Sequence, residues 1–152
     1  MQKHDFYQSL VKQTESLIAG ESNVIANMAN ISALLFTSLE DVNWAGFYFI
    51  DSQSELVLGP FQGNPACIRI PVGKGVCGTA AATLQTQLIE DVHAFDGHIA
   101  CDAASNSEIV VPIMKHGKIF AVLDIDSPSI SRFDTDDKAG LEALVKCFEA
   151  SL

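Results

Sequence analysis

Apolar residues recur at the spacing of an α-helix near both ends of the chain. Residues 5–19 form the first such stretch, and a second, richer in apolar residues, follows a capping residue at Ser22 or Asn23. A third follows a cap at Asp134 or Thr135 and carries acidic residues in its first turn. The pattern therefore predicts two helices at the start of the chain, the second more buried, and one helix at its end.

The middle of the chain has the two-residue period of β-strands. In residues 43–50 this alternation separates two faces, with Trp44, Gly46 and Tyr48 on one and Ala45, Phe47 and Phe49 on the other. Five further strands are expected, at residues 55–59, 68–72, 87–91, 109–114 and 119–126. An alanine-rich short helix is expected at 79–84, whereas 59–67 and 92–107 have no regular period.

The order of these elements predicts an α+β fold. Hairpins dominate and few parallel crossovers are needed, so we expect an antiparallel sheet with the terminal helices on one face. The other face is then free to hold a ligand pocket, and the irregular stretch 92–107 is long enough to be a binding loop or lid over it. A chain of 152 residues is expected to form one domain, residues 1–152.

Charge and composition narrow the range of functions. The chain has 9 basic and 19 acidic side chains, a net charge of -10, which disfavours nucleic acid and anionic membrane surfaces as partners. No stretch approaches the ~20 apolar residues of a membrane span, and the polar first residues do not resemble a secretory signal, so we expect a cytoplasmic protein. In that compartment the 4 cysteines are expected to be reduced, metal-binding or redox-active, not paired in structural disulfides.

One predicted loop contains a cysteine in polar surroundings. Cys101 stands there beside His98, and Glu108 follows where the next strand begins. Cys67 and Cys77 precede this loop in the chain. A cysteine retained only for packing is expected in an apolar run, so the polar surroundings of Cys101 favour a nucleophilic or redox-active thiol.

Carboxylates form a second group of candidates. Asp124 and Asp126 are two residues apart on a predicted strand and therefore project from the same face. Crowded carboxylates repel one another, which raises the pKa of at least one and keeps a proton available near neutral pH. Together with Glu108 they are candidates for donating a proton or holding a cation, although acids at a strand end are also common on the solvent surface.

A glycine pattern offers an alternative site. Gly73, Gly75 and Gly78 match the dinucleotide-binding fingerprint, and Asp91 follows where a ribose-binding acid is expected. The surrounding hairpins differ from the repeated strand-helix-strand units of a Rossmann sheet, which favours a tight strand-to-helix turn instead.

A zinc site is the other alternative. His93, His98, Cys67, Cys77 and Cys101 are all possible zinc ligands. The chain has no Cys-x-x-Cys pair, so the ligand spacing does not favour a metal.

Six motifs lie within residues 41–127. They are Asn43-Trp44-Ala45-Gly46-Phe47-Tyr48, Leu58-Gly59-Pro60-Phe61-Gln62-Gly63-Asn64-Pro65-Ala66-Cys67, Gly73-Lys74-Gly75-Val76-Cys77-Gly78, Gly97-His98-Ile99-Ala100-Cys101-Asp102, Ser107-Glu108-Ile109-Val110-Val111-Pro112 and Val122-Leu123-Asp124-Ile125-Asp126-Ser127. Through these motifs the sequence resembles the free methionine-(R)-sulfoxide reductases, which are stand-alone GAF domains. The resemblance implies a GAF-like domain that reduces free L-methionine-(R)-S-oxide.

The resemblance also implies roles for the cysteines. Cys101 is the attacking cysteine, Cys67 resolves the resulting sulfenic acid as a disulfide, and Cys77 is either an auxiliary thiol or a small residue packed at a helix start. Thioredoxin regenerates the dithiol and no cofactor is needed. Cys147 lies outside the motifs and is expected to be structural.

The remaining site residues follow from the same resemblance. Glu108, Asp124 and Asp126 are expected to protonate the sulfoxide oxygen and to hold the substrate ammonium. Trp44 and Tyr48 are expected to enclose the methyl thioether end, whereas the residues alone favour ordinary core positions for both.

Two hypotheses about assembly and function remain open. Surplus apolar residues on the terminal helices point to a homodimer. The alternative to an enzyme is a ligand-sensing GAF module that acts through a partner protein. A sensor needs no nucleophile with a resolving partner, so the cysteines favour the enzyme.

Overall fold

The computed structural model describes residues 2–51, 54–99 and 104–152. Its elements in chain order are α1 (Lys3–Ile18), α2 (Val24–Ser38), β1 (Trp44–Ile50), β2 (Glu55–Gly63), β3 (Arg69–Pro71), α3 (Gly75–Thr83), β4 (Gln87–Ile89), the 3-10 turn η1 (Val92–Ala94), β5 (Ser107–Lys115), β6 (Lys118–Ser127) and α4 (Thr135–Glu149). Asn23 caps α2 and Asp134 caps α4, as the sequence predicts. No helix among the described residues is long and apolar enough to cross a membrane.

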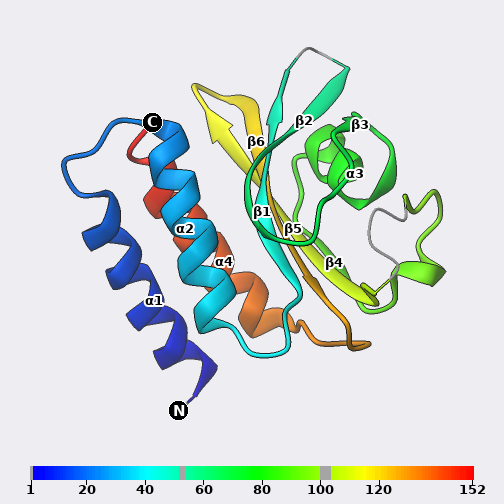
Figure 1. Cartoon of the computed structure of the whole chain (residues 1–152), viewed down its shortest axis with the longest axis horizontal. Coiled ribbons are helices and arrows are strands. Elements are labelled where there is room, and N and C mark those ends of the chain that lie inside the picture. The colour runs from blue at the N-terminus through cyan, green and yellow to red at the C-terminus, as the bar shows by residue number, and fades with distance from the viewer. Residues whose placement is uncertain (1, 52–53, 100–103) are drawn as a thin grey trace.

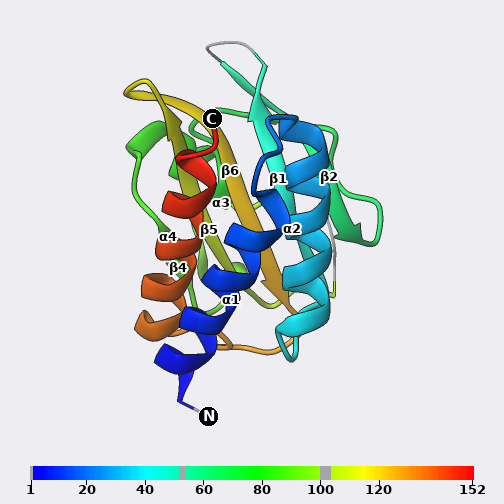
Figure 2. The same ribbon diagram turned by 90° about the vertical axis from the view of Figure 1, so that its left-hand side faces the viewer.

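The strands form a single sheet in the order β3-β2-β1-β6-β5-β4, and each described pair of neighbours is antiparallel. Helices α1, α2 and α4 cover one face, while α3 and the segment around η1 lie on the other (Figures 1 and 2). The predicted α+β architecture is confirmed. An entirely antiparallel sheet has no place for a Rossmann unit, so the glycine fingerprint does not mark a dinucleotide site.

Each face of the sheet has its own apolar core. On the helix side, Ala45 and Phe47 pack with residues of α1, α2 and α4. On the other side, Trp44 and Tyr48 pack against α3 and β3. The alternation predicted for β1 is therefore confirmed, and it assigns the two largest side chains of the strand to the face opposite the terminal helices.

Strand β2 is longer than predicted, because it continues through Pro60 to Gly63 instead of ending at residue 59. The β1–β2 register shifts between Gly46 and Tyr48, so Pro60 falls in an irregular part of the ladder where its missing N–H is tolerated. From sequence, a proline predicts the end of a strand. The bulge that accommodates Pro60 depends on the pairing with β1, which the local sequence does not reveal.

Helix α3 begins at Gly75, four residues before the predicted start at residue 79. Gly73 and Gly75 have φ of 91° and 62°, and the N–H of Gly73 donates to the carbonyl of Gly78 at 2.8 Å. A Cβ on Gly78 would lie 2.4 Å from the carbonyl oxygen of Pro71. These glycines form the tight strand-to-helix turn that the sequence favours, and the turn brings Cys77 into the first turn of the helix.

Candidate functional site

The register of the central strands aligns the predicted carboxylates with an aromatic residue. Glu108 of β5 pairs with Asp126 of β6, which pairs on its other side with Trp44 of β1. Asp124 lies two residues further along and pairs with Gly46. Because these positions share one parity, their side chains project from the face that α3 covers, while Ile125 packs in the helix-side core.

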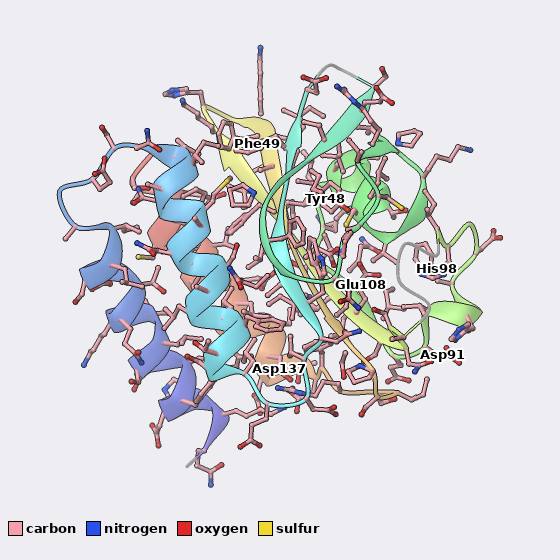
Figure 3. All side chains as sticks on the ribbon, viewed as in Figure 1. Tyr48, Phe49, Asp91, His98, Glu108 and Asp137 are labelled. Carbon is pink, nitrogen blue, oxygen red and sulfur yellow. The ribbon has the colours of Figure 1, made fainter. Side chains whose placement is uncertain are left out.

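A small cavity lies over this row of residues, with a volume of about 40 Å³. Its lining includes Trp44, Tyr48, Ala66, Ile70, Gly75, Val76, Cys77, His98, Ile99, Ser105, Glu108, Asp124 and Asp126. Figure 3 shows Tyr48 and Glu108 on the α3 side of the sheet and His98 at its margin, whereas Asp137 lies among the helices of the opposite side. The cavity thus brings together six of the eight site residues predicted from sequence.

Three acidic or thiol groups meet at the cavity wall. Ligand-type atoms of Cys77, Glu108 and Asp124 lie within 4.8 Å of one another. Their exposed fractions are 4%, 8% and 5%, so little water reaches them. The Oδ1 atom of Asp124 has no hydrogen-bond partner among the described residues. A buried acceptor without a hydrogen bond destabilises the folded protein, and it is available to a ligand that enters the cavity.

Burial determines the protonation of this cluster. Desolvation, followed by the charge of Asp124, raises the pKa of Glu108 well above 4.5. Desolvation and the charge of Asp126 raise the pKa of Asp124 well above 3.8. The Glu108 carboxyl is also hydrogen-bonded to Asp124 and Asp126, and two carboxyl groups form such a bond only when one carries a proton. The cluster therefore holds a proton under conditions where exposed carboxyl groups have lost theirs.

The aromatic residues connect the sheet to the segment that contains Cys67. The hydroxyl of Tyr48 donates to the carbonyl of Cys67 at 2.8 Å, and Trp44 Nε1 donates to the carbonyl of Asn64 at 3.1 Å. Trp44 stacks on Phe61, with ring centroids 5.1 Å apart. Both aromatic residues are buried in the core and line the cavity, so the two expectations for them are compatible. They also fix the backbone that positions Cys67, which the sequence does not predict.

The cysteines occupy different environments. Cys67 is half-buried and disulfide-bonded. Cys77 is a free, buried thiol, and burial followed by the charge of Asp124 raises its pKa. Cys147 is free on α4 and packs against the helix-side core. Cys101 lies outside the described residues, so its predicted role stays a prediction.

The set of zinc ligands considered from sequence is not gathered into one group in the described part of the chain. There, the acidic or thiol groups close enough to share a metal ion are Cys77, Glu108 and Asp124. His93 lies at the surface, and its Nδ1 contacts Asp91 Oδ1 at 3.0 Å. His98 lines the cavity, and burial followed by the charge of His93 lowers its pKa.

Several lining residues are not identified by the sequence. Ile70, Val76 and Ile99 line the cavity with apolar side chains, which look like ordinary core residues in the sequence. Val76 also lies before the predicted start of its helix. The sequence could have identified His98 as a lining residue, because it is an aromatic base three residues before the candidate nucleophile Cys101.

The chain is similar to known proteins over its whole length. The sequence model of the GAF domain matches residues 26–146. The free methionine-R-sulfoxide reductase of Escherichia coli is 57% identical over 152 residues, which is 100% of this chain and 92% of that protein. The protein of the same name from Saccharomyces cerevisiae is 44% identical over 158 residues, covering 99% of this chain and 88% of that protein.

Comparison with solved structures finds proteins of the same name. The crystal structure of free methionine-R-sulfoxide reductase from Neisseria meningitidis in complex with its substrate has a TM-score of 0.95 and 44% identity. The comparison covers 99% of this chain and 89% of that chain.

Replacing Glu108 with glutamine is expected to change how stability depends on pH. The folded protein retains the Glu108 proton above pH 4.5, where the unfolded chain releases it. The free energy of unfolding therefore falls with rising pH above ~4.5, by up to about 1.4 kcal/mol per pH unit for one retained proton. Glutamine does not titrate, so the free energy of unfolding of Glu108→Gln does not fall in this way. We expect the variant to be more stable than the wild type at pH 8, and the difference in the free energy of unfolding to be smaller at pH 4.

Urea unfolding at pH 4, 6 and 8, followed by circular dichroism, measures this difference. Glu90 is an exposed acid near the same sheet edge, and Glu90→Gln serves as the matched control. A gap between wild type and Glu108→Gln that stays constant or shrinks as pH rises contradicts a protonated, buried Glu108.

Proposed function

The chain belongs to the GAF domain family and, within it, to the free methionine-R-sulfoxide reductases, and from this we propose that it reduces free L-methionine-(R)-S-oxide to L-methionine. The observation that carries the proposal is the buried, proton-holding group of Glu108 and Asp124 in a cavity near a disulfide-bonded cysteine. Relatives that carry this enzyme name match the chain over almost their full length. The same comparisons support a single domain over residues 1–152.

The proposed reaction begins with the thiolate of Cys101. It attacks the sulfoxide sulfur while a carboxyl group of the cavity gives a proton to the sulfoxide oxygen. Transfer of the resulting hydroxyl to the cysteine sulfur leaves a sulfenic acid on Cys101 and releases methionine. The Cys67 thiol then attacks the sulfenic sulfur, and its proton leaves with the sulfenic hydroxyl as water while the disulfide forms. The disulfide-bonded state of Cys67 supports this assignment.

The carboxyl groups have two proposed tasks. A neutral acid is needed to protonate the sulfoxide, and the raised pKa values of Glu108 and Asp124 make them the candidates. A negative charge is needed to hold the substrate ammonium, and Asp126, at the same cavity wall, is the candidate. Trp44 and Tyr48 supply a flat apolar wall for the methyl thioether group.

Cys77 is proposed to act as a neutral hydrogen-bond donor instead of a redox thiol. It is hydrogen-bonded to Asp124, and this bond lowers the Asp124 pKa against the larger opposing effect of burial. Its raised pKa keeps it as a thiol, which is a poor nucleophile. Its exposed fraction of 4% also denies access to a protein reductant.

The remaining proposals concern the surroundings of the enzyme. Thioredoxin supplies the electrons, no bound cofactor takes part, and the protein works in the cytoplasm. A homodimer is proposed from the exposed apolar residues Leu17 of α1 and Ile25 of α2, which lie on the helix side of the sheet, away from the cavity.

The substrate proposal is tested by competition in one dithiothreitol-driven assay. We expect L-methionine-(R)-S-oxide to react at least about tenfold faster than its N-acetyl derivative, because the derivative loses a charge-assisted contact worth ~1.5–3 kcal/mol. The (S) epimer is expected to remain unreacted, because its oxygen points away from the acid. Chiral chromatography of free and acetylated methionine measures all three. Equal consumption of the acetylated compound argues against ammonium recognition, and no methionine from any substrate favours the ligand-sensing alternative.

Single cysteine variants test the assigned redox roles. With thioredoxin as reductant, Cys101→Ser is expected to form no methionine, because a serine hydroxyl has too high a pKa to attack sulfur. Cys67→Ser is expected to form one equivalent and then stop, because the sulfenic acid has no resolving thiol. Cys147→Ser is the matched control and should turn over as the wild type does. Retained activity in Cys101→Ser assigns the nucleophile elsewhere.

Two substitutions at Cys77 separate a hydrogen-bond donor from a redox thiol. Cys77→Ser keeps a donor toward Asp124 and should retain turnover with thioredoxin. Cys77→Ala removes the donor, so we expect a ~3- to 10-fold lower kcat, equivalent to a lost hydrogen bond. It also removes an effect that lowers the Asp124 pKa, so the alkaline fall in kcat should move to higher pH. Equal loss of thioredoxin-driven turnover in both variants, with dithiothreitol turnover intact, identifies Cys77 as a redox thiol.

A further inference from the structure

A protein reductant has to reach the disulfide of Cys67 from outside, and the structure limits where it approaches. Cys77 lies in the first turn of α3 and is buried, so it offers no entry point. Cys67 is half-buried, and most of residues 62–69 around it are exposed. We call these eight residues the Cys67 margin. Disulfide exchange requires access to sulfur, so a reductant that attacks the sulfur of Cys67 makes contact here.

One apolar side chain stands out on the Cys67 margin. Ile68 is 67% exposed, more than any other large apolar residue in the described part of the chain. Its carbonyl accepts a hydrogen bond from the N–H of Leu58 at 2.9 Å, so the backbone is fixed to β2 while the side chain faces solvent. An exposed apolar side chain on a fixed backbone offers area that a protein partner can bury.

The charge distribution supports contact at the same place. The chain carries 19 acidic residues, yet none lies between residues 56 and 89, a stretch that contains Arg69 and Lys74. Arg69 is half-exposed and forms ion pairs with Asp51 and Glu55, which neutralises the nearest acids. The Cys67 margin therefore carries no acidic side chain of its own, which removes one source of repulsion toward a protein partner.

We propose that the Cys67 margin, with Ile68 as its apolar anchor, is the docking surface for the protein dithiol that reduces the enzyme. This inference rests on the proposed function, and the occupant is a thioredoxin-type protein with two neighbouring thiols. Ile68 contacts that protein and takes no part in the reduction of the sulfoxide.

Docking at the Cys67 margin places the reductant for a two-step exchange. The first thiolate of the reductant bonds to Sγ of Cys67 as the proposed bond to Cys101 breaks, and the Cys101 sulfur leaves as a thiolate that takes up a proton. The second thiolate of the reductant then attacks the mixed disulfide at the reductant's own sulfur. Cys67 leaves as a thiolate, two electrons have passed to the enzyme, and the reductant is a disulfide.

The experiment compares two reductants for the same set of variants. Ile68→Ser and Ile68→Asp are measured with a bacterial thioredoxin, recycled by thioredoxin reductase and NADPH, and separately with dithiothreitol. We expect kcat/KM for thioredoxin to fall about tenfold in Ile68→Ser and further in Ile68→Asp. Dithiothreitol-driven turnover should stay within twofold of the wild type, because a small thiol needs no docking surface, and it also reports correct folding.

Ile130→Ser is the matched control, because Ile130 is 53% exposed and lies outside the Cys67 margin. Its neighbour Ser131 donates its N–H to the carbonyl of Glu90 beside β4, at the sheet edge opposite β3. Ile130→Ser is expected to match the wild type with both reductants. An unchanged kcat/KM for thioredoxin in both Ile68 variants overturns the proposal, as does an equal loss in Ile130→Ser or a parallel loss with dithiothreitol. If the wild type forms no methionine with dithiothreitol, the proposed function fails, which is a separate result.

Discussion

The antiparallel register of β1, β6 and β5 is the constraint on which both the core and the cavity depend. The pairing that places Phe47 and Ile125 among the helices also places Asp124 and Glu108 on the opposite face. A slip of one residue would turn the carboxyl groups into the helix-side core and expose its apolar residues. The apolar face thus selects the one register that builds the acidic face.

Burial destabilises the ionised form of the carboxyl groups, and the same burial keeps a proton on them that they can donate. Ionising a buried, unpaired carboxylate costs several kcal/mol, and the cluster avoids this by keeping a proton on Glu108 or Asp124. Under the proposed function, that proton is the one the sulfoxide oxygen receives. The helix-side core supplies stability away from the site, so the cavity can retain a cluster that reduces stability at neutral pH.

Most of the fold follows from local patterns in the sequence, whereas the contacts within the site do not. The helix caps, the alternation of β1 and the shared face of Asp124 and Asp126 all depend on residues close together in the chain. The passage of β2 through Pro60 depends on a bulge opposite β1, and the contact of Cys77 with Asp124 depends on how α3 packs on the sheet. Such contacts between distant segments leave no local pattern to detect.

Accessibility separates Cys67 from Cys77, which differ in the sequence only through the roles that the family resemblance implies. Cys77 and Cys67 both precede the predicted nucleophile, and both are small, polarizable residues at the edge of regular structure. The early start of α3 buries Cys77 near Asp124, whereas the hydroxyl of Tyr48 holds the backbone of Cys67, whose side chain is half-buried. A thiol that passes electrons to a protein has to be reached from the solvent, and of these two Cys67 is the more accessible.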